Sequence, residues 1–274
     1  MSERASELSA RSERASESLT RSERASELSA VGTSTETPRW VVLEGCENVR
    51  DLGGLPLRDG GRTRFGQVLR SARLHELTDA DVRFLTEDFG LRTVIDLRSP
   101  REVEKDGPTP LERAGVRTEH LTVLPAGQRP IPREDEDPKL FNYRGYLAHR
   151  PENMTAAVRV LTEADAGPTL VHCAAGKDRT GVFCALVEDA VGVTRDAVVH
   201  DYAMSNERLM AVLSRGVGSE YDIDPADIEL YRCPPELMEA VFADLDPDGA
   251  AVGWLRRQGL ADGELDRLRA RLID

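Results

Sequence analysis

One segment in the second half of the chain restricts the possible folds more than any other. A short apolar run, residues 169–171, is followed by HCAAGKDRTG at residues 172–181, and residues 181–191 are then apolar nearly all round. A buried strand that turns through small residues into a buried helix is typical of a parallel sheet. We therefore expect an α/β fold in which residues 172–181 lie at the carboxyl end of a strand, where such sheets place their ligands.

The chain before this segment alternates in the same way. Short apolar runs at residues 40–43 and 67–70 and predicted strands at residues 93–97 and 120–124 are separated by helical patterns. Those patterns comprise residues 80–88 after a cap at Thr78 or Asp79, a turn opened by Ser99 and Pro100, and a face formed by Met154, Ala157, Val158 and Leu161. Residues after about 194 have helical patterns only. We expect a central, mostly parallel sheet flanked by helices, with a helical C-terminal region.

The N-terminus has a different composition. Residues 2–31 are three near-copies of a ten-residue unit rich in Ser, Glu, Arg and Ala, with almost no apolar side chains to bury. Repeats this short and polar cannot form a solenoid core. We expect residues 1–38 to form a disordered tail and residues 39–274 to form one domain. A phosphorylated or partner-binding tail, or a misplaced start codon, is the alternative.

Charge and cysteine content exclude several classes of partner. Acidic residues outnumber basic ones 49 to 36, for a formal net charge of −13, which disfavours nucleic acid and anionic lipid. No apolar run approaches the roughly 18 residues of a membrane span, so no integral membrane association is expected. The four cysteines form no CxxC pair, and the N-terminus lacks a signal peptide's apolar stretch. Three lysines among 36 basic residues suggest a bacterial source, and the few cysteines fit a cytoplasmic setting, although export without a signal peptide stays open.

The small residues of the loop predict an anion site. Ala174, Ala175 and Gly176 allow the backbone to curl so that successive N–H groups face inward. The N-terminus of the following helix adds a partial positive charge. Cys173 lies at the centre of that field, which stabilises its thiolate and makes it a nucleophile. The plain alternative is a small buried cysteine beside a flexible glycine turn.

Two further loop residues extend this interpretation to catalysis. The rigid guanidinium of Arg179 can donate hydrogen bonds to two oxygens of a phosphate. Thr180 can donate its hydroxyl to the Cys173 sulfur. We expect a two-step reaction in which Cys173 forms a phosphocysteine and water then hydrolyses it. Arg179 and the loop amides supply the charge stabilisation, so we expect no metal and no cofactor, and inorganic phosphate should bind in the loop.

The same residues carry a resemblance to a known family. HCxxGxxR[ST] is the signature loop of the cysteine-based phosphatases, and HCAAGKDRTG resembles the bacterial tyrosine-protein phosphatase branch. Similar segments are NVRDLGG at residues 48–54, LRS at 69–71, DLRS at 96–99 and the pattern around residues 253–272. The resemblance covers residues 39–274. It implies the phosphatase fold with a helical lid over the pocket, which we expect within residues 194–237.

The general acid is less determined. Many relatives carry it in a Trp-Pro-Asp motif, which this sequence lacks. The resemblance implies that Asp178, inside the loop, serves instead, although Lys177 and Arg179 should lower the pKa of its carboxyl. Asp51 and Asp96 are alternative acids, and Asp178 could instead accept hydrogen bonds from loop amides.

Lys177 adds a second cation to the loop and favours substrates with more than one phosphate. The resemblance implies activity toward phosphoinositides, and an exposed lysine at a turn is the alternative. We therefore expect a protein-tyrosine or dual-specificity phosphatase whose partner is a phosphorylated protein or phosphoinositide. A phosphoinositide phosphatase is the second hypothesis. A phosphate-recognition module without turnover and a sulfur-transfer enzyme are the rivals from other classes.

Overall fold

The computed structural model describes residues 38–125, 127, 130–215 and 225–274. The predicted tail, residues 1–38, lies outside the described residues apart from Pro38, so its disorder stays a prediction. No helix in the described part of the chain is long and apolar enough to cross a membrane.

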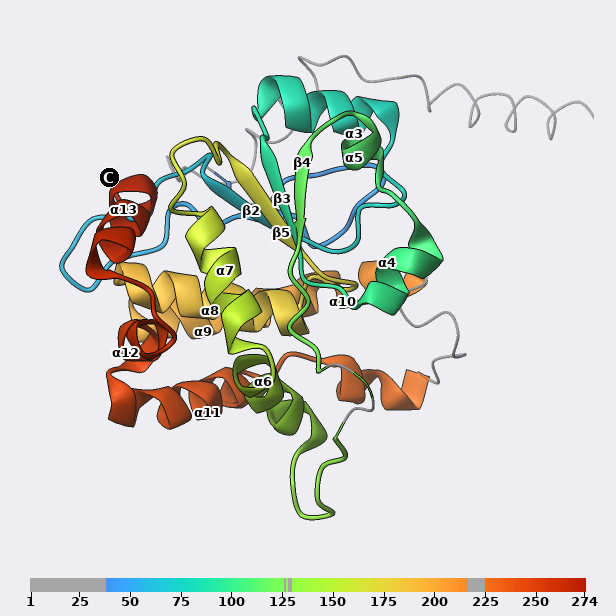
Figure 1. Ribbon diagram of the computed structural model, residues 1–274. Helices are drawn as coiled ribbons and strands as arrows, with labels where there is room; N and C mark the ends of the chain where they lie inside the picture. The colour runs from blue at the N-terminus through green and yellow to red at the C-terminus, as the bar shows by residue number, and fades with distance from the viewer. Residues whose placement is uncertain (1–37, 126, 128–129, 216–224) are drawn as a thin grey trace, which may run out of the picture. The chain divides into compact units, whose positions relative to one another are not determined.

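A five-stranded sheet in the order β1-β2-β5-β3-β4 forms the centre of the domain (Figure 1). Its strands are Arg50–Asp51 (β1), Val68–Ser71 (β2), Thr93–Asp96 (β3), Arg117–His120 (β4) and Thr169–His172 (β5). Only β1 runs antiparallel to its neighbour; the other pairs are parallel. The expected α/β class with a mostly parallel sheet is therefore confirmed. The register places Ser71 and Asp96 on either side of His172, at the carboxyl edge of the sheet.

Successive residues of the central strands point to opposite faces of the sheet, and both sets are buried. Helices therefore cover each face. In β5, Val171 belongs to one apolar cluster and Leu170 to the other. The first cluster includes residues of α6 (Pro138–Ala148), α7 (Pro151–Val160), α8 (Asp178–Val191), α9 (Arg195–Ala203), α11 (Pro235–Leu245), α12 (Ala250–Arg257) and α13 (Asp262–Leu272). The second includes residues of the π-helical turn η2 (Phe84–Asp88), α5 (Pro110–Arg113) and α10 (Leu209–Ser214), with α3 (Asp79–Arg83) leading into η2. The helices after β5 therefore pack mainly on one face.

The remaining short helices lie at the edges of this arrangement. They are α4 (Pro100–Asp106), η3 (Met204–Arg208), η4 (Pro225–Tyr231) and η5 (Asp246–Asp248). Thr78 caps α3 and Ser99 caps α4, each in a reciprocal capping box, as the sequence predicted for these two starts.

One predicted strand is misplaced, and one of the short apolar runs forms no strand. The strand expected at residues 120–124 is β4, which ends at His120, and its four residues are exposed or half-buried. As an edge strand it carries polar side chains, while Val123 and Leu124, which follow it, are buried without joining the sheet. The run at residues 40–43 forms no strand, since only Trp40 makes an isolated bridge, to Arg50.

Candidate active site

The loop of residues 173–177 joins the end of β5 to the start of α8, where the sequence predicted it. Cys173 is the first residue after β5 and is only 2% exposed. Asp178 opens α8, a helix of 14 residues whose amino end is directed at the loop. A cysteine in this position lies at the positive end of a long helix dipole.

The backbone of this loop is polarised. All five carbonyl groups of residues 173–177 accept a hydrogen bond from a neighbouring group. The donors are His172 Nδ1 to Cys173 (3.1 Å), Arg73 N to Ala174 (3.0 Å), Asn48 Nδ2 to Ala175 (3.3 Å) and Gly176 (3.0 Å), Arg70 Nη2 to Gly176 (3.0 Å) and Gly181 N to Lys177 (2.8 Å). By contrast, the backbone N–H groups of residues 174–177 have no acceptor among the described residues. Free donors opposite satisfied carbonyls form the concave nest that binds an anion.

Gly176 is required at its position in the nest. Its φ is +67°, and a Cβ there would lie 2.3 Å from the carbonyl oxygen of Ser71, at the end of β2. Any other side chain would therefore meet both backbone strain and a steric overlap. The loop is pressed against the edge of the sheet at this residue.

A buried ionic cluster supports the loop from below. Arg70 donates to Asp201 Oδ2 at 2.6 Å as well as to Gly176, and Arg50 donates to Asp201 Oδ1 at 3.1 Å and to Asn48 Oδ1 at 2.5 Å. Burial acts to raise the pKa of Asp201, but Arg50 and Arg70 outweigh burial and hold that pKa far below its usual range. The carboxylate thus fixes the two arginines, and they and Asn48 fix the loop. These residues were not predicted as functional.

Arg179 is held by an acid that the sequence analysis missed. Its Nη1 and Nη2 donate to Glu102 Oε2 and Oε1, both at 2.8 Å. Glu102 is the third residue of α4 and also accepts from the backbone N–H of Ser99 in the capping box. Burial acts to raise the pKa of Glu102, but Arg179 and Ser99 together outweigh burial and lower that pKa to about 2. The sequence Ser-Pro-x-Glu does predict a capping box for Glu102. It contains no signal that this carboxylate also pairs with Arg179.

Thr180 leaves its hydroxyl free. Its side chain is fully buried in the first turn of α8, and its Oγ1 has no hydrogen-bond partner in the described part of the chain. A buried hydroxyl without a partner is uncommon, and it indicates that a hydrogen-bond acceptor reaches the hydroxyl during function. The predicted partner is the sulfur of Cys173.

Asp178 is engaged by side chains instead of loop amides. Tyr143 donates its hydroxyl to Oδ1 at 2.6 Å, and Lys177 Nζ lies 3.0 Å from Oδ2. Burial acts to raise the pKa of Asp178, but Lys177 and Tyr143 outweigh it and hold the pKa below its usual value. Lys177 itself is 7% exposed, so the alternative of an exposed turn lysine is wrong.

The two alternative acids are occupied elsewhere. Asp51 accepts the backbone N–H groups of Gly53 (2.7 Å) and Gly66 (2.8 Å) with its two oxygens. Asp96 receives three hydrogen bonds from the Arg98 side chain. Burial raises the pKa of Asp96, yet the histidines and Arg98 beside it hold it far below its usual range. Asp96 is thus a charged acceptor and unsuited to donate a proton.

His172 is the second buried group behind the nucleophile. Because a carbonyl only accepts, its Nδ1 must carry the proton donated to Cys173 O. Burial lowers the pKa of His172, which favours the neutral ring. The histidine therefore orients the cysteine backbone.

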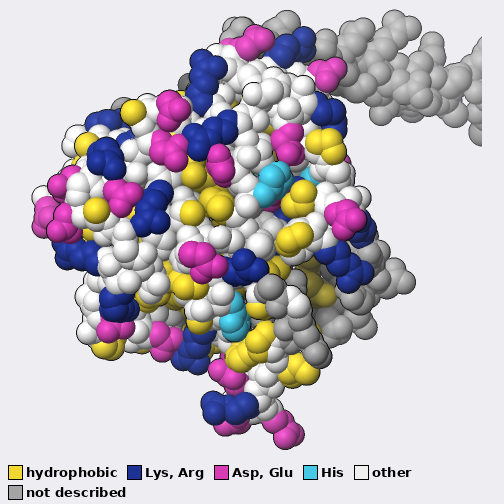
Figure 2. All heavy atoms as spheres, in the orientation of Figure 1, with side chains coloured by type: hydrophobic (Ala, Val, Ile, Leu, Met, Phe, Trp, Pro, Cys, Tyr) yellow, Lys and Arg dark blue, Asp and Glu magenta, His cyan; other side chains and the backbone are white. Residues whose placement is uncertain are grey.

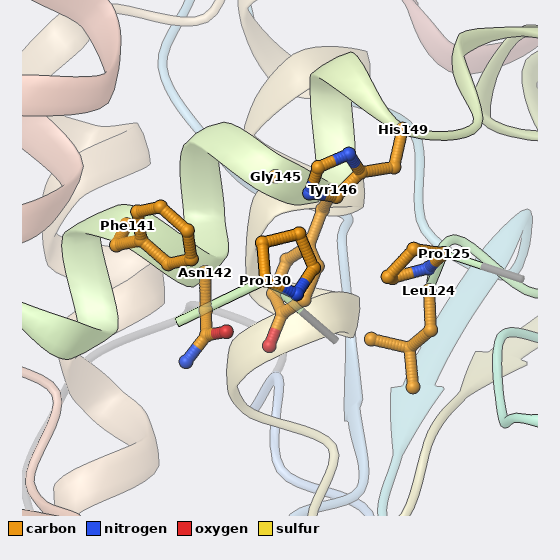
Figure 3. A pocket seen from close by; sticks show the side chains of 8 residues that line it. All are labelled: Leu124, Pro125, Pro130, Phe141, Asn142, Gly145, Tyr146 and His149. Carbon is orange, nitrogen blue, oxygen red and sulfur yellow. The ribbon is translucent and has the colours of Figure 1, made fainter. Parts of the chain in front are cut away.

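Two hollows lie beside α4 and α6, and no residue of the loop 173–177 lines either of them. The larger has a volume of about 730 Å³ and is lined by Ser99, Pro100, Arg101, Thr122, Leu124, Pro125, Gly127 and Arg150. Figure 3 shows the smaller one, where Tyr146 and other residues of α6 face Leu124, Pro125 and Pro130. Acidic and basic side chains are interspersed over the face in Figure 2, without a large region of one sign. Any bound anion would therefore have to be held by local groups, of which the loop is one.

The predicted lid lies partly outside the described residues. Within residues 194–237 the structure has α9, η3, α10, η4 and the start of α11, and residues 216–224 are not described. The lid stays a prediction. The described part of this region does contribute Asp201 below the loop and Tyr202, whose hydroxyl lies 2.8 Å from that of Tyr143.

Sequence comparison relates the chain to known proteins. A family model described as "Tyrosine phosphatase family" matches residues 41–274. The triple specificity protein phosphatase PtpB of Mycobacterium tuberculosis is 28% identical, over 84% of this chain and 98% of its own. A tyrosine-protein phosphatase of Nostoc commune is 31% identical, over 74% and 73% of the two chains.

Solved structures give more distant matches. The core catalytic domain of the PP-IP phosphatase SIW14 from S. cerevisiae, in complex with citrate, matches 70% of this chain and 95% of its own at 16% identity and a TM-score of 0.33. P. aeruginosa TpbA matches 75% and 85% of the two chains at 20% identity and a TM-score of 0.28.

Proposed function

The chain belongs to the tyrosine phosphatase family, and from this premise we propose that it hydrolyses phosphate monoesters of proteins through a phosphocysteine on Cys173. The observation that carries the proposal is the polarised loop: five carbonyls with donors and four N–H groups without acceptors around a buried cysteine. Tyrosine or dual specificity is the substrate range that the named relatives favour. The compartment in which the protein acts, predicted as the cytoplasm, stays a prediction.

In the first step the thiolate of Cys173 attacks phosphorus. A sulfur–phosphorus bond forms and the bond from phosphorus to the leaving oxygen breaks. Asp178 gives its proton to that oxygen, while Arg179 and the N–H groups of Ala174, Ala175, Gly176 and Lys177 bind the equatorial oxygens. Lys177 lies within reach of the same anion, so a bound phosphate would offset its effect on Asp178 and favour the protonated carboxyl.

In the second step a water molecule attacks phosphorus and the sulfur leaves. Asp178, now a carboxylate, takes a proton from the water, and inorganic phosphate is released. The free hydroxyl of Thr180 is suited to donate to the departing sulfur and so to stabilise the thiolate. The loop is then ready to bind phosphate as product or as a competing anion.

A second candidate, phosphoinositide hydrolysis, has its own support. Lys177 adds a buried cation to the loop, and the hollow of about 730 Å³ beside α4 carries Arg101 and Arg150. These cations suit a substrate with two or more phosphates. The relative from M. tuberculosis is named a triple specificity phosphatase, which agrees with a broad substrate range.

The test compares free-phosphate release by the wild type, Cys173→Ser and Cys46→Ser. The panel holds phosphotyrosine, phosphoserine and phosphothreonine peptides and a set of phosphoinositides. Cys46 is a matched control, because it is buried and its Sγ already contacts Ala72 O at 3.5 Å, an acceptor that a serine hydroxyl also suits. We expect release by the wild type and Cys46→Ser and none by Cys173→Ser, with the preferred substrate separating protein from lipid.

The opposite result identifies the rival. If the wild type releases no phosphate from any substrate yet binds phosphopeptides, the loop is a recognition module and the enzymatic proposal is wrong. If Cys173→Ser keeps full activity, the phosphocysteine mechanism is wrong.

A further inference from the structure

Two buried tyrosines lie in line behind Asp178. The hydroxyl of Tyr143, on α6, is 2.6 Å from Asp178 Oδ1, and the hydroxyl of Tyr202, on α9, is 2.8 Å from that of Tyr143. Both side chains are 1% exposed. Three elements that are distant in sequence thus meet at one carboxyl group of the loop.

The chemistry of the groups fixes the direction of these hydrogen bonds. An ionised carboxylate can only accept, so the single proton of Tyr143 is donated to Asp178. Tyr143 must then accept from Tyr202. Burial, together with the charge of Asp178, raises the pKa of Tyr143 well above its usual value, which keeps that proton in place. Oδ1 of the carboxylate therefore accepts the 2.6 Å bond from Tyr143 and a longer one, 3.2 Å, from Lys177 Nζ, while Oδ2 lies 3.0 Å from the same Nζ. Protonation of Oδ2 preserves the shorter Tyr143 bond, so Oδ2 is the oxygen suited to carry the transferable proton.

We propose that Tyr143, supported by Tyr202, is a positioning residue that presents Oδ2 of Asp178 to the leaving oxygen of the substrate. The inference rests on the proposed role of Asp178 as general acid. As the proton passes from Oδ2 to the leaving oxygen, negative charge develops on the carboxyl group. The hydrogen bond from Tyr143 becomes stronger in the same step, because bonds to charged acceptors are stronger than bonds to neutral ones. Tyr143 thus favours the transition state over the bound substrate.

Other groups also face Asp178. Lys177 approaches from the loop itself and Lys139 from α6, and Cys233 acts from the segment before α11. The two lysines favour the carboxylate, whereas the Cys233 thiolate, if formed, would oppose it. These groups set the charge around Asp178, but Tyr143 is the one that fixes Oδ1 by a short hydrogen bond.

A phenylalanine isolates the effect of the hydroxyl. The Tyr143 ring packs edge-on against Tyr202 at 6.0 Å and lies 5.9 Å from the ring of Tyr146, so Tyr143→Phe keeps these contacts. The experiment measures kcat/KM for the wild type, Tyr143→Phe, Asp178→Asn and the double variant. The substrates are 4-nitrophenyl phosphate, which has a good leaving group, and phenyl phosphate, which has a poor one and needs the acid.

The expected pattern is specific. Asp178→Asn should lose about 100-fold or more on phenyl phosphate and much less on 4-nitrophenyl phosphate. Tyr143→Phe should lose roughly 10-fold on phenyl phosphate alone. In the Asp178→Asn background, Tyr143→Phe should have no further effect, because a positioning residue has nothing left to position. Tyr202→Phe should show the same leaving-group pattern with a smaller loss in kcat/KM. This variant replaces Tyr143→Phe in the test if Tyr143→Phe does not fold.

Two failures can be told apart. Independent, multiplicative losses in the double variant, or equal losses on both substrates for both tyrosine variants, overturn the positioning role while leaving Asp178 as the acid. Equal losses on both substrates for Asp178→Asn remove the acid itself, and with it this inference and that part of the proposed mechanism. Phosphate release that still depends on Cys173 would show that the nucleophile is unaffected by that outcome.

Discussion

The guanidinium of Arg179 and the carboxylate of Glu102 form a bidentate ion pair, with Nη1 2.8 Å from Oε2 and Nη2 2.8 Å from Oε1. The partners come from different elements, the first turn of α8 and the first turn of α4. A guanidinium has five N–H donors. Beside this pair and a long contact of 3.5 Å from Nη1 to Leu97 O, Nε and the second hydrogen of Nη2 are left for a second anion. Glu102 therefore orients Arg179 without consuming its capacity to bind phosphate.

Replacing Glu102 by Gln should weaken catalysis. The amide has one acceptor oxygen and no charge, so Arg179 loses one of two charge-assisted hydrogen bonds and part of its orientation. We expect kcat/KM for 4-nitrophenyl phosphate to fall about 10- to 100-fold, as steady-state kinetics will measure. Glu104→Gln, on an exposed residue of the same helix, is the control. An unchanged kcat/KM for Glu102→Gln would mean that Arg179 needs no orienting partner.

The same pair should make stability depend on pH. The folded-state pKa of Glu102 is about 2, below its ordinary value of 4.5, because Arg179 and Ser99 outweigh burial. A lowered carboxyl pKa means that the pair stabilises the fold above about pH 4.5 and that this contribution is lost as the pH falls toward 2. Urea unfolding between pH 5 and pH 2.5, a range set by those two values, should show a shallower decline for Glu102→Gln. Parallel curves for the two proteins would contradict the assignment.

Lys177 should control the protonation of Asp178. Its ammonium group, 3.0 Å from Oδ2, favours the carboxylate and outweighs the opposing effect of burial. In Lys177→Met the pKa of Asp178 should therefore rise, and the proton should stay on the acid to a higher pH. The descending limb of kcat/KM against pH should move to higher pH, with Lys105→Met, in the last turn of α4, as the control. A shift to lower pH would exclude Asp178 as the group that titrates there.

The sequence was sufficient to predict the loop because its signals are local. A strand, three small residues and a buried helix follow one another within residues 169–191, so the turn and its place at the sheet edge need no long-range information. The edge strand β4 was misplaced for the converse reason. It has no buried side chain, and the apolar signal comes from the residues after it.

The residues that support the loop could not be predicted, because they are distant from the loop in the sequence. Glu102 is 77 positions from Arg179, Tyr143 is 35 from Asp178, and Asn48 is 128 from Gly176. Each belongs to a local pattern with another reading, such as a capping box or an ordinary helix face. Only the strand order and register bring them to one edge of the sheet.

Gly176→Ala should damage both stability and activity. The new Cβ would lie 2.3 Å from Ser71 O at a φ of +67°, so the loop must move away from β2. Gly90→Ala is a matched control, with a φ of +78° and no atom within 4 Å of the added Cβ, and it adds only the backbone strain. We expect Gly176→Ala to lower the free energy of unfolding in urea by about 1–3 kcal/mol more than Gly90→Ala, and to lose phosphatase activity while Gly90→Ala keeps it. Equal losses of stability, with activity retained in both, would show that the loop has room to relax and that its close contact with β2 is not needed for the nest.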